Sequence, residues 1–162
     1  MFNFFKKKND DSISIKAVAD GKIIPISDVK DPVFAQKMMG DGIAILPTSS
    51  FICAPIDGTI QLIHDTKHAF GMINDAGLEI LVHIGLDTVN LKGEGFKALA
   101  KAGDSVKAGT PIIEIDLAFL NEKGMDITTP IVLLNHSQFK LEFQQANQAK
   151  AGETLLIKAT KA

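Results

Sequence analysis

The stretch His68-Ala-Phe-Gly-Met-Ile73, followed by Asn74-Asp-Ala-Gly77 and Leu78-Glu-Ile-Leu-Val-His83, decides the fold class of this chain. Two short apolar segments flank a cluster of turn-forming residues, which is typical of a β-hairpin. A four-residue turn at 74–77 makes His68 the partner of His83. Directly opposed residues have Cβ atoms roughly 4.5–5.5 Å apart. We therefore expect two imidazoles to meet, and such a pair suits phosphoryl chemistry or metal binding better than packing.

The same count assigns the two faces of the hairpin. In the second strand, Leu78, Ile80, Val82 and Ile84 form one wholly apolar face, so alternation places His83 on the opposite face. The predicted register also pairs Ile73 with Leu78, and Phe70 with Leu81. We expect an apolar collar around the histidines that could dock a partner, and its members are Phe70, Met72 and Leu81. A three-residue loop with a bulge would stagger the histidines.

Composition limits the kind of protein. The chain has 162 residues, a net charge of −2 and a single cysteine, Cys53. The charge argues against a nucleic-acid partner. The lone cysteine excludes an internal disulfide and fits a reducing cytosol, where we expect it to be a small buried residue. All 17 basic residues are lysine. A bound phosphate would therefore rely on backbone N–H groups, histidine or a partner's arginine.

Short strands separated by Gly, Pro and Asp predict an all-β fold, a mainly antiparallel β-sandwich/barrel hybrid with short connecting helices. Helices are expected at Asp31–Met38, where Asp precedes Pro, and at Asp116–Lys123, which ends before Gly124. The expected strands are Ile13–Ala17, Gly21–Pro25, Gly42–Pro47, Ser50–Cys53, Gly58–Leu62, Ala69–Ile73, Leu78–Ile84, Lys92–Ala98, Pro111–Asp116, Ile131–Leu134, Phe139–Phe143 and Leu155–Ala159.

We expect a flexible N-terminal tail over residues 1–14 and one domain over 15–162. The segment Met1–Lys8 combines three phenylalanines with three lysines and has no signal-peptide core. It is interpreted as a solubilising tail, with a short interfacial anchor of weak membrane affinity as the alternative. Because no run approaches the roughly 20 apolar residues of a membrane span, a transmembrane segment is not expected.

Further polar residues accompany the histidine pair. Thr66 lies two residues before His68, and Asp87 follows His83 beyond Gly85, where the chain can bend sharply. Asp41, between two glycines, opens another strand. Either aspartate could equally be a simple turn residue. We expect the remaining histidines, His64 and His136, to be structural or merely exposed.

Several motifs in consistent order resemble the glucose-type IIA component of the bacterial phosphoenolpyruvate-dependent sugar phosphotransferase system, with a family core at about residues 29–136. The resemblance implies a β-sandwich with a two-histidine active site. The motifs are Gly40-Asp-Gly-Ile-Ala-Ile45, Ala54-Pro-Ile-Asp-Gly-Thr59, Thr66-Lys-His-Ala-Phe70, Leu81-Val-His-Ile-Gly-Leu-Asp-Thr88 and Leu91-Lys-Gly-Glu-Gly-Phe96.

The resemblance implies a role for each matching residue. His83 matches the phosphoacceptor, His68 its helper and Thr66 the helper's hydrogen-bond partner, while Asp41 and Asp87 match acidic positions near the site. Phosphate would come from the histidine-containing phosphocarrier protein and pass to a cysteine on the IIB domain of a sugar permease. No cofactor is required. The protein would be cytoplasmic, with peripheral contact to the inner face of the membrane if the tail binds lipid.

Two other classes of function compete with this interpretation. A zinc hydrolase of a related hybrid fold could use His68, His83 and a carboxylate as ligands, and weaker zinc bridging by the two histidines at a partner interface is compatible with phosphotransfer. A purely regulatory docking module is the second alternative. A biotin or lipoate carrier is disfavoured because the turn at 74–77 lacks a lysine.

Overall fold

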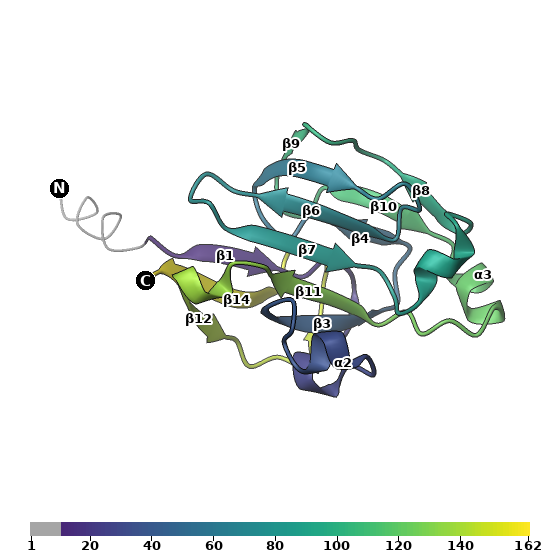
Figure 1. Cartoon of the computed structure of the whole chain (residues 1–162), viewed down its shortest axis with the longest axis horizontal. Helices are drawn as coiled ribbons and strands as arrows, with labels where there is room; N and C mark the ends of the chain where they lie inside the picture. The colour runs from purple at the N-terminus through teal and green to yellow at the C-terminus, as the bar shows by residue number, and fades with distance from the viewer. Residues whose placement is uncertain (1–10) are drawn as a thin grey trace.

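The computed structural model describes residues 11–162. The membrane contact expected of Met1–Lys8 lies outside the described residues, as does most of the tail expected over 1–14. Within the described part, the chain is almost entirely β-structure with a few short helices (Figure 1). All strand pairs are antiparallel. The predicted all-β sandwich is therefore confirmed.

A large sheet carries the hairpin in its middle. Its order is β13-β2-β3-β11-β7-β6-β5-β9, and Figure 1 shows its central strands across the front of the molecule. Two smaller sheets have the orders β1-β14-β12 and β4-β10-β8. The strands are β1 (Ile13–Lys16), β2 (Gly21–Pro25), β3 (Asp41–Pro47), β4 (Phe51–Cys53), β5 (Gly58–Ile63), β6 (Ala69–Ile73), β7 (Glu79–His83), β8 (Phe96–Ala98), β9 (Ser105–Val106), β10 (Pro111–Ile115), β11 (Thr129–Leu133), β12 (Phe139–Phe143), β13 (Gln148–Ala149) and β14 (Leu155–Lys161).

The helices are short, and their ends follow the sequence. Asp31 accepts a hydrogen bond from Val33 N at the start of α2, and Asp116 accepts one from Phe119 N at the start of α3. Both predicted helices are confirmed, although shorter than expected. The strand expected over Lys92–Ala98 shrinks to β8, because positive φ angles at Lys92, Gly93 and Gly95 bend the chain before it. The helical elements are η1 (Ile26–Asp28), α2 (Pro32–Ala35), η2 (Thr88–Leu91), α3 (Leu117–Glu122) and η3 (His136–Gln138).

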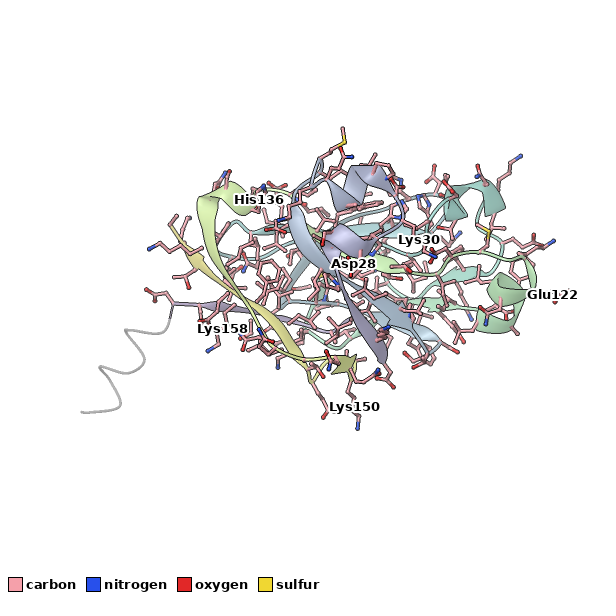
Figure 2. All side chains as sticks on the ribbon, turned by 90° about the horizontal axis from the view of Figure 1, so that it is seen from below. Asp28, Lys30, Glu122, His136, Lys150 and Lys158 are labelled. Carbon is pink, nitrogen blue, oxygen red and sulfur yellow. The ribbon has the colours of Figure 1, made fainter. Side chains whose placement is uncertain are left out.

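The large sheet buries apolar residues on both faces. Its inner face contributes to the main core, which includes Ile45, Phe70, Val82 and Ile131. The outer face has a smaller cluster beneath η1 and α2, made of Ile26, Val29, Phe34, Ala44, Leu86 and Val132. Figure 2, seen from the side of α2, shows Asp28 and Lys30 in this covering segment. This cover packs on β3 and β11 through Ala44 and Val132.

The predicted hairpin register is wrong by one residue. Ile73 pairs with Glu79, and His83 pairs with Ala69 instead of His68. The cause is the loop, which spans residues 74–78. Asn74 accepts hydrogen bonds on its side-chain oxygen from Ala76 N and Leu78 N. Because the Asn74 side chain bonds to Leu78 N, Leu78 belongs to the loop and not to the strand, so the loop is one residue longer than predicted.

The predicted apolar collar is also wrong. A one-residue slip moves every side chain of a strand to the other face of the sheet. In the observed register Phe70 pairs with Val82 and Met72 with Ile80, so both belong to the inner core and are fully buried. Leu81 shares the outer face with His83, but only 9% of it is exposed. These residues hold the hairpin in the sandwich and do not form a docking surface.

Candidate functional site

The structure brings His68 and His83 together despite the slipped register. Their ring centroids are 5.0 Å apart and nearly perpendicular, at 79°. Strand β6 begins only at Ala69, and Lys67 has a left-handed φ of 57°. His68 therefore lies outside the strict alternation of the strand. Its carbonyl oxygen still accepts a hydrogen bond from Ile84 N at 2.6 Å, which ties it to the end of β7.

One hydrogen bond fixes the chemical state of His83. Its Nδ1 lies 2.8 Å from the carbonyl oxygen of Gly85. Because a carbonyl oxygen can only accept, Nδ1 carries the proton. Burial lowers the pKa of His83, and the charge of His64 lowers it further, against the raising effects of the Gly85 carbonyl, Asp31 and Asp87. The ring is therefore neutral near pH 7, and Nε2 presents a free lone pair that can act as a nucleophile.

His68 is held by a different partner. Its Nδ1 lies 2.6 Å from the hydroxyl of Thr66, the residue that the sequence predicted beside it. Only 5% of the side chain is exposed. Burial, with smaller contributions from the charges of His83 and His64, lowers the pKa of His68 to about 4. At neutral pH this imidazole is uncharged and can donate one hydrogen bond from a ring nitrogen.

Acid should destabilise the fold through His68. A histidine whose pKa falls from about 6.5 unfolded to about 4 folded binds protons better when unfolded. Its contribution is complete above pH 6.5 and is lost as the pH falls toward 4. Urea unfolding measures this effect. Between pH 7 and pH 4.5, we expect the free energy of unfolding of the wild type to fall by about 2 kcal/mol more than that of His68→Gln. Equal losses in the two proteins would contradict this.

The site requires glycine at position 85. Its φ is +79°, and a Cβ there would lie 2.6 Å from Thr88 Cγ2 and 3.0 Å from Asp126 O. Both neighbours are fixed: the Thr88 hydroxyl donates to Ile84 O at 2.5 Å, and Asp126 O accepts from Leu86 N at 2.8 Å. The carbonyl that orients His83 is thus part of a tightly packed turn.

Gly85→Ala should therefore lower the free energy of unfolding by more than the strain of a positive φ alone would. Gly77 offers a matched control, since its φ is +87° and a Cβ there would meet nothing within 4 Å. We expect Gly77→Ala to lower the free energy of unfolding by about 1 kcal/mol and Gly85→Ala by about 3 kcal/mol. Chemical denaturation of both variants measures the difference. Similar losses would show that packing around Gly85 is looser than the structure indicates.

The two predicted aspartates have different contacts. Asp87 adopts a left-handed conformation before η2, and its charge acts on His83. Asp41 instead accepts a hydrogen bond from Gly42 N and forms an ion pair with Lys37 at 3.6 Å. It lines a cavity of about 430 Å³ with Ile43 and Phe143, in which no histidine takes part. Neither the hydrogen bond nor the ion pair of Asp41 involves His68 or His83, and its expected role at the site stays a prediction.

Sequence reasoning missed Asp31. Its charge raises the pKa of His83, and it lines a cavity of about 270 Å³ together with Lys30, Leu86, Asp87 and Asp126. The sequence marked Asp31 only as a helix cap. No local sequence pattern marks this position, because it depends on the fold: the short helix that Asp31 caps brings the Phe34 ring to 5.1 Å from the ring of His83. Asp31 thus both caps α2 and acts as an acidic neighbour of His83.

An apolar rim does exist, but on another element. Val33, Met38 and Met39 around α2 and Val89 in η2 are 37–69% exposed. These segments flank the cover that contacts His83 and replace the predicted collar as the exposed apolar surface near the histidines. A further missed residue is His64, whose ring centroid lies 5.1 Å from that of His68.

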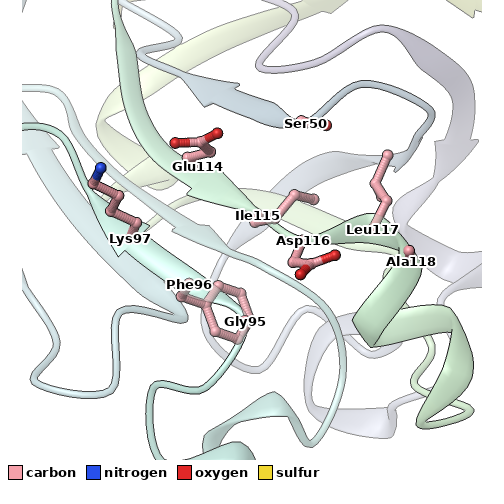
Figure 3. A pocket seen from close by; sticks show the side chains of 9 residues that line it. All are labelled: Ser50, Gly95, Phe96, Lys97, Glu114, Ile115, Asp116, Leu117 and Ala118. Atoms are coloured by element: carbon pink, nitrogen blue, oxygen red, sulfur yellow. The ribbon is translucent and has the colours of Figure 1, made fainter.

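Other features of the molecule lie away from this chemistry. A cavity of about 550 Å³ opens between β8, β10 and the start of α3 (Figure 3), and Lys97 and Glu114 face one another across its strands. It includes no histidine. Among residues 11–162, no group of three or more His, Cys, Asp or Glu side chains is arranged to hold a metal ion. None of the helices in that range is long and apolar enough to span a membrane.

Comparisons with known proteins give one consistent answer. The family model for the phosphoenolpyruvate-dependent sugar phosphotransferase system, EIIA 1, matches residues 13–139. The chain is 46% identical to a glucose-specific EIIA component of Buchnera aphidicola, over 96% of this chain and 94% of that protein. It is 44% identical to one from Halalkalibacterium halodurans, over 97% and 94%.

A solved structure agrees with the sequence comparisons. Glucose permease IIA from Mycoplasma capricolum superposes with a TM-score of 0.86 at 38% identity, covering 91% of this chain and 96% of that one. The match implies contacts with a phosphocarrier protein and with a IIB component of a sugar permease. The chain therefore belongs to the EIIA type 1 family of the phosphoenolpyruvate-dependent sugar phosphotransferase system, and it is a phosphotransferase that serves sugar uptake.

Proposed function

We propose that His83 accepts a phosphoryl group on Nε2 from the histidine-containing phosphocarrier protein and passes it to a cysteine of a sugar-permease IIB domain. The observation that carries this proposal is the hydrogen bond from His83 Nδ1–H to Gly85 O, which leaves the Nε2 lone pair free. The glucose-specific names of the relatives make glucose the sugar of choice.

The transfer needs no group beyond the reacting partners. The Nε2 lone pair attacks the phosphorus of the carrier's phosphohistidine, and an N–P bond forms as the carrier's N–P bond breaks. The electron pair of the broken bond returns to the carrier's ring. In the second step a cysteine thiolate of the IIB domain attacks phosphorus, and the pair of the breaking bond returns to His83 Nε2. Throughout, the proton stays on His83 Nδ1, which donates it in a hydrogen bond to the Gly85 carbonyl oxygen.

His68 holds the transferring group as a neutral donor. We assign the Thr66 hydroxyl as the donor to His68 Nδ1, an arrangement that leaves the ring proton of His68 on Nε2, in a ring 5.0 Å from that of His83. A phosphoryl oxygen on His83 can accept that proton in a hydrogen bond. Phosphoryl transfer depends mainly on positioning and on stabilisation of charge on the moving oxygens. A buried, preoriented donor suits that need because it does not reorganise during the reaction.

Asp31 and Asp87 serve recognition in this proposal. The chain has no arginine, so a cationic group of the partner would face these carboxylates beside His83. The exposed Val33, Met38 and Met39 supply apolar contact next to them. We place the relay in the cytoplasm, in keeping with a single, buried cysteine.

Neutralising the two carboxylates should weaken docking. We expect the double variant Asp31→Asn and Asp87→Asn to raise the KM for the phosphorylated carrier about tenfold at low salt, and less at high salt. Asparagine retains the cap of α2, so folding should be preserved. Asp75→Asn is the matched control, because it removes an exposed charge at the far end of the hairpin. An unchanged KM in the double variant, or an equal rise in the control, would exclude this role.

Reconstitution of the relay tests the proposed function. The chain is mixed with labelled phosphoenolpyruvate, enzyme I, the phosphocarrier and membranes that hold a glucose permease lacking its own IIA. We expect label to appear on the chain and then on a glucose analogue, but not on mannitol. Label that reaches the chain and goes no further would exclude glucose permease as the recipient.

The two histidines alone do not complete a metal site, so a zinc ion there would need ligands from a partner.

A further inference from the structure

Three residues form a row across the outer face at the edge of the site. The backbone N of His64 donates to Ala69 O at 3.0 Å, which extends the β5–β6 ladder one step beyond Ile63 and Phe70. Ala69 in turn pairs with His83. Paired residues share a face of the sheet, so we infer that His64, which directly follows β5, lies in line with Ala69 and His83.

The ring of His68 occupies the middle of this row. The centroid of the His68 ring lies 5.1 Å from that of His64 and 5.0 Å from that of His83, so His68 contacts both of the other rings. His68 is consequently almost fully buried, whereas His64 is exposed to solvent. The site is therefore a continuous series of three imidazoles with one solvent-facing end.

The charges around the series are unbalanced. Of the charged groups that act on His83, two are the carboxylates Asp31 and Asp87, and the one that can be cationic is His64. His68 is neutral at pH 7 because burial lowers its pKa. In each salt bridge of residues 11–162 the basic partner is a lysine. The His64 ring therefore takes part in none of these salt bridges. A phosphoryl dianion on His83 would therefore lie near two carboxylates and one imidazole that can carry a positive charge.

The other charged groups around His64 come from its own turn and from the loop after η2. A Cβ on Gly93 of that loop would lie 3.9 Å from Thr66 Cα, so the loop packs against the turn. The titratable and charged residues in these two segments and at the adjoining ends of the hairpin strands are Asp65, Lys67, His68, His83, Lys92 and Glu94.

We propose that His64 is a third functional histidine, whose imidazolium form stabilises the phosphoryl group on His83 through the intervening His68 ring. This inference rests on the proposed phosphorylation of His83. His64 acts as a positioning residue, and its effect is electrostatic. An imidazolium favours the dianionic phosphoryl group, and imidazoles change charge between pH 5 and 8. The phosphohistidine of this protein is consequently more stable, relative to that of the carrier, at pH 6 than at pH 8.5.

Nitrogen-15 NMR of the histidine rings tests the inference directly. The full chain is titrated alone and with phosphoenolpyruvate, enzyme I and carrier present to keep His83 phosphorylated. At pH 6.5 we expect phosphorylation to move the ring ¹⁵N signals of His64 toward those of an imidazolium, because the added dianion favours that form. The ring signals of His136, in η3 (Figure 2), should not move.

Two variants separate charge from shape. His64→Gln removes the charge at every pH and should lower the equilibrium constant for transfer from the carrier about threefold at pH 6, with little change at pH 8.5. His64→Lys keeps a charge at both values and should remove the pH dependence. Unmoved His64 ring signals on a chain phosphorylated at His83 overturn this inference alone. A wild-type chain without phosphate on His83 overturns it together with the proposed function.

Discussion

Replacing His83 with alanine is expected to abolish phosphorylation of the chain by the phosphocarrier protein. The methyl group has no lone pair to attack phosphorus, so we expect the rate to fall by at least about 10³-fold. The structure argues against rescue by His68, since its Nδ1 is engaged by Thr66 and its ring is buried. Labelled phosphoenolpyruvate with enzyme I and carrier measures the rate.

Two controls make this result specific. His136→Ala removes a histidine in η3 and should leave the rate unchanged. His83 is only partly buried, so the alanine variant should fold, and its urea unfolding should confirm this. Phosphorylation of His83→Ala at more than a tenth of the wild-type rate would mean that the acceptor is another residue.

Replacing His68 with glutamine should separate the two halves of the relay. The Nε2 lone pair of His83 is intact in this variant, so we expect acceptance of phosphate within about tenfold of the wild type. Transfer to the IIB cysteine should fall about 10²–10³-fold, the usual cost of removing one preoriented donor to a developing charge. In the inward step the carrier holds the phosphoryl group, whereas in the outward step His68 must hold it while the bond to His83 loosens.

Rapid-quench measurement of each half-reaction distinguishes these effects. Thr66→Val should change the outward step in the same direction but less, because it frees His68 Nδ1 without removing the ring. Thr66→Ser, which keeps a hydroxyl, should behave like the wild type. Equal loss of acceptance and donation in His68→Gln would contradict the division of roles between the two histidines.

The sequence predicted the fold class, and the reason lies in alternation. Leu78, Ile80 and Val82 mark one buried face of β7 without any knowledge of its partners. The register with β6 depends instead on how Asn74 bonds to the backbone of its own loop. That bonding pattern is one of several open to an Asn-Asp-Ala-Gly segment, and a one-residue difference inverted the predicted faces of Phe70 and Met72.

The site was predicted in part for a related reason. Gly85 and Thr66 are close in sequence to the histidines they contact, so spacing was informative. Asp31 reaches the site only because η1 and α2 fold over the outer face of the sheet, a long-range contact that no local pattern contains. Asp41 was named because it lies within a recognisable motif; its ion pair with Lys37 and its cavity involve no histidine, and its role at the site stays a prediction.

The most direct test of the account is the position of phosphate on the intact chain. The ¹⁵N-labelled protein is phosphorylated by phosphoenolpyruvate, enzyme I and carrier, and its phosphorus–nitrogen couplings are recorded by NMR. The account predicts a single phosphohistidine, with phosphorus bonded to Nε2 of His83 and a proton on Nδ1, because Nδ1–H donates to Gly85 O. Phosphate on Nδ1 of His83, or on His68 or His64, would contradict it.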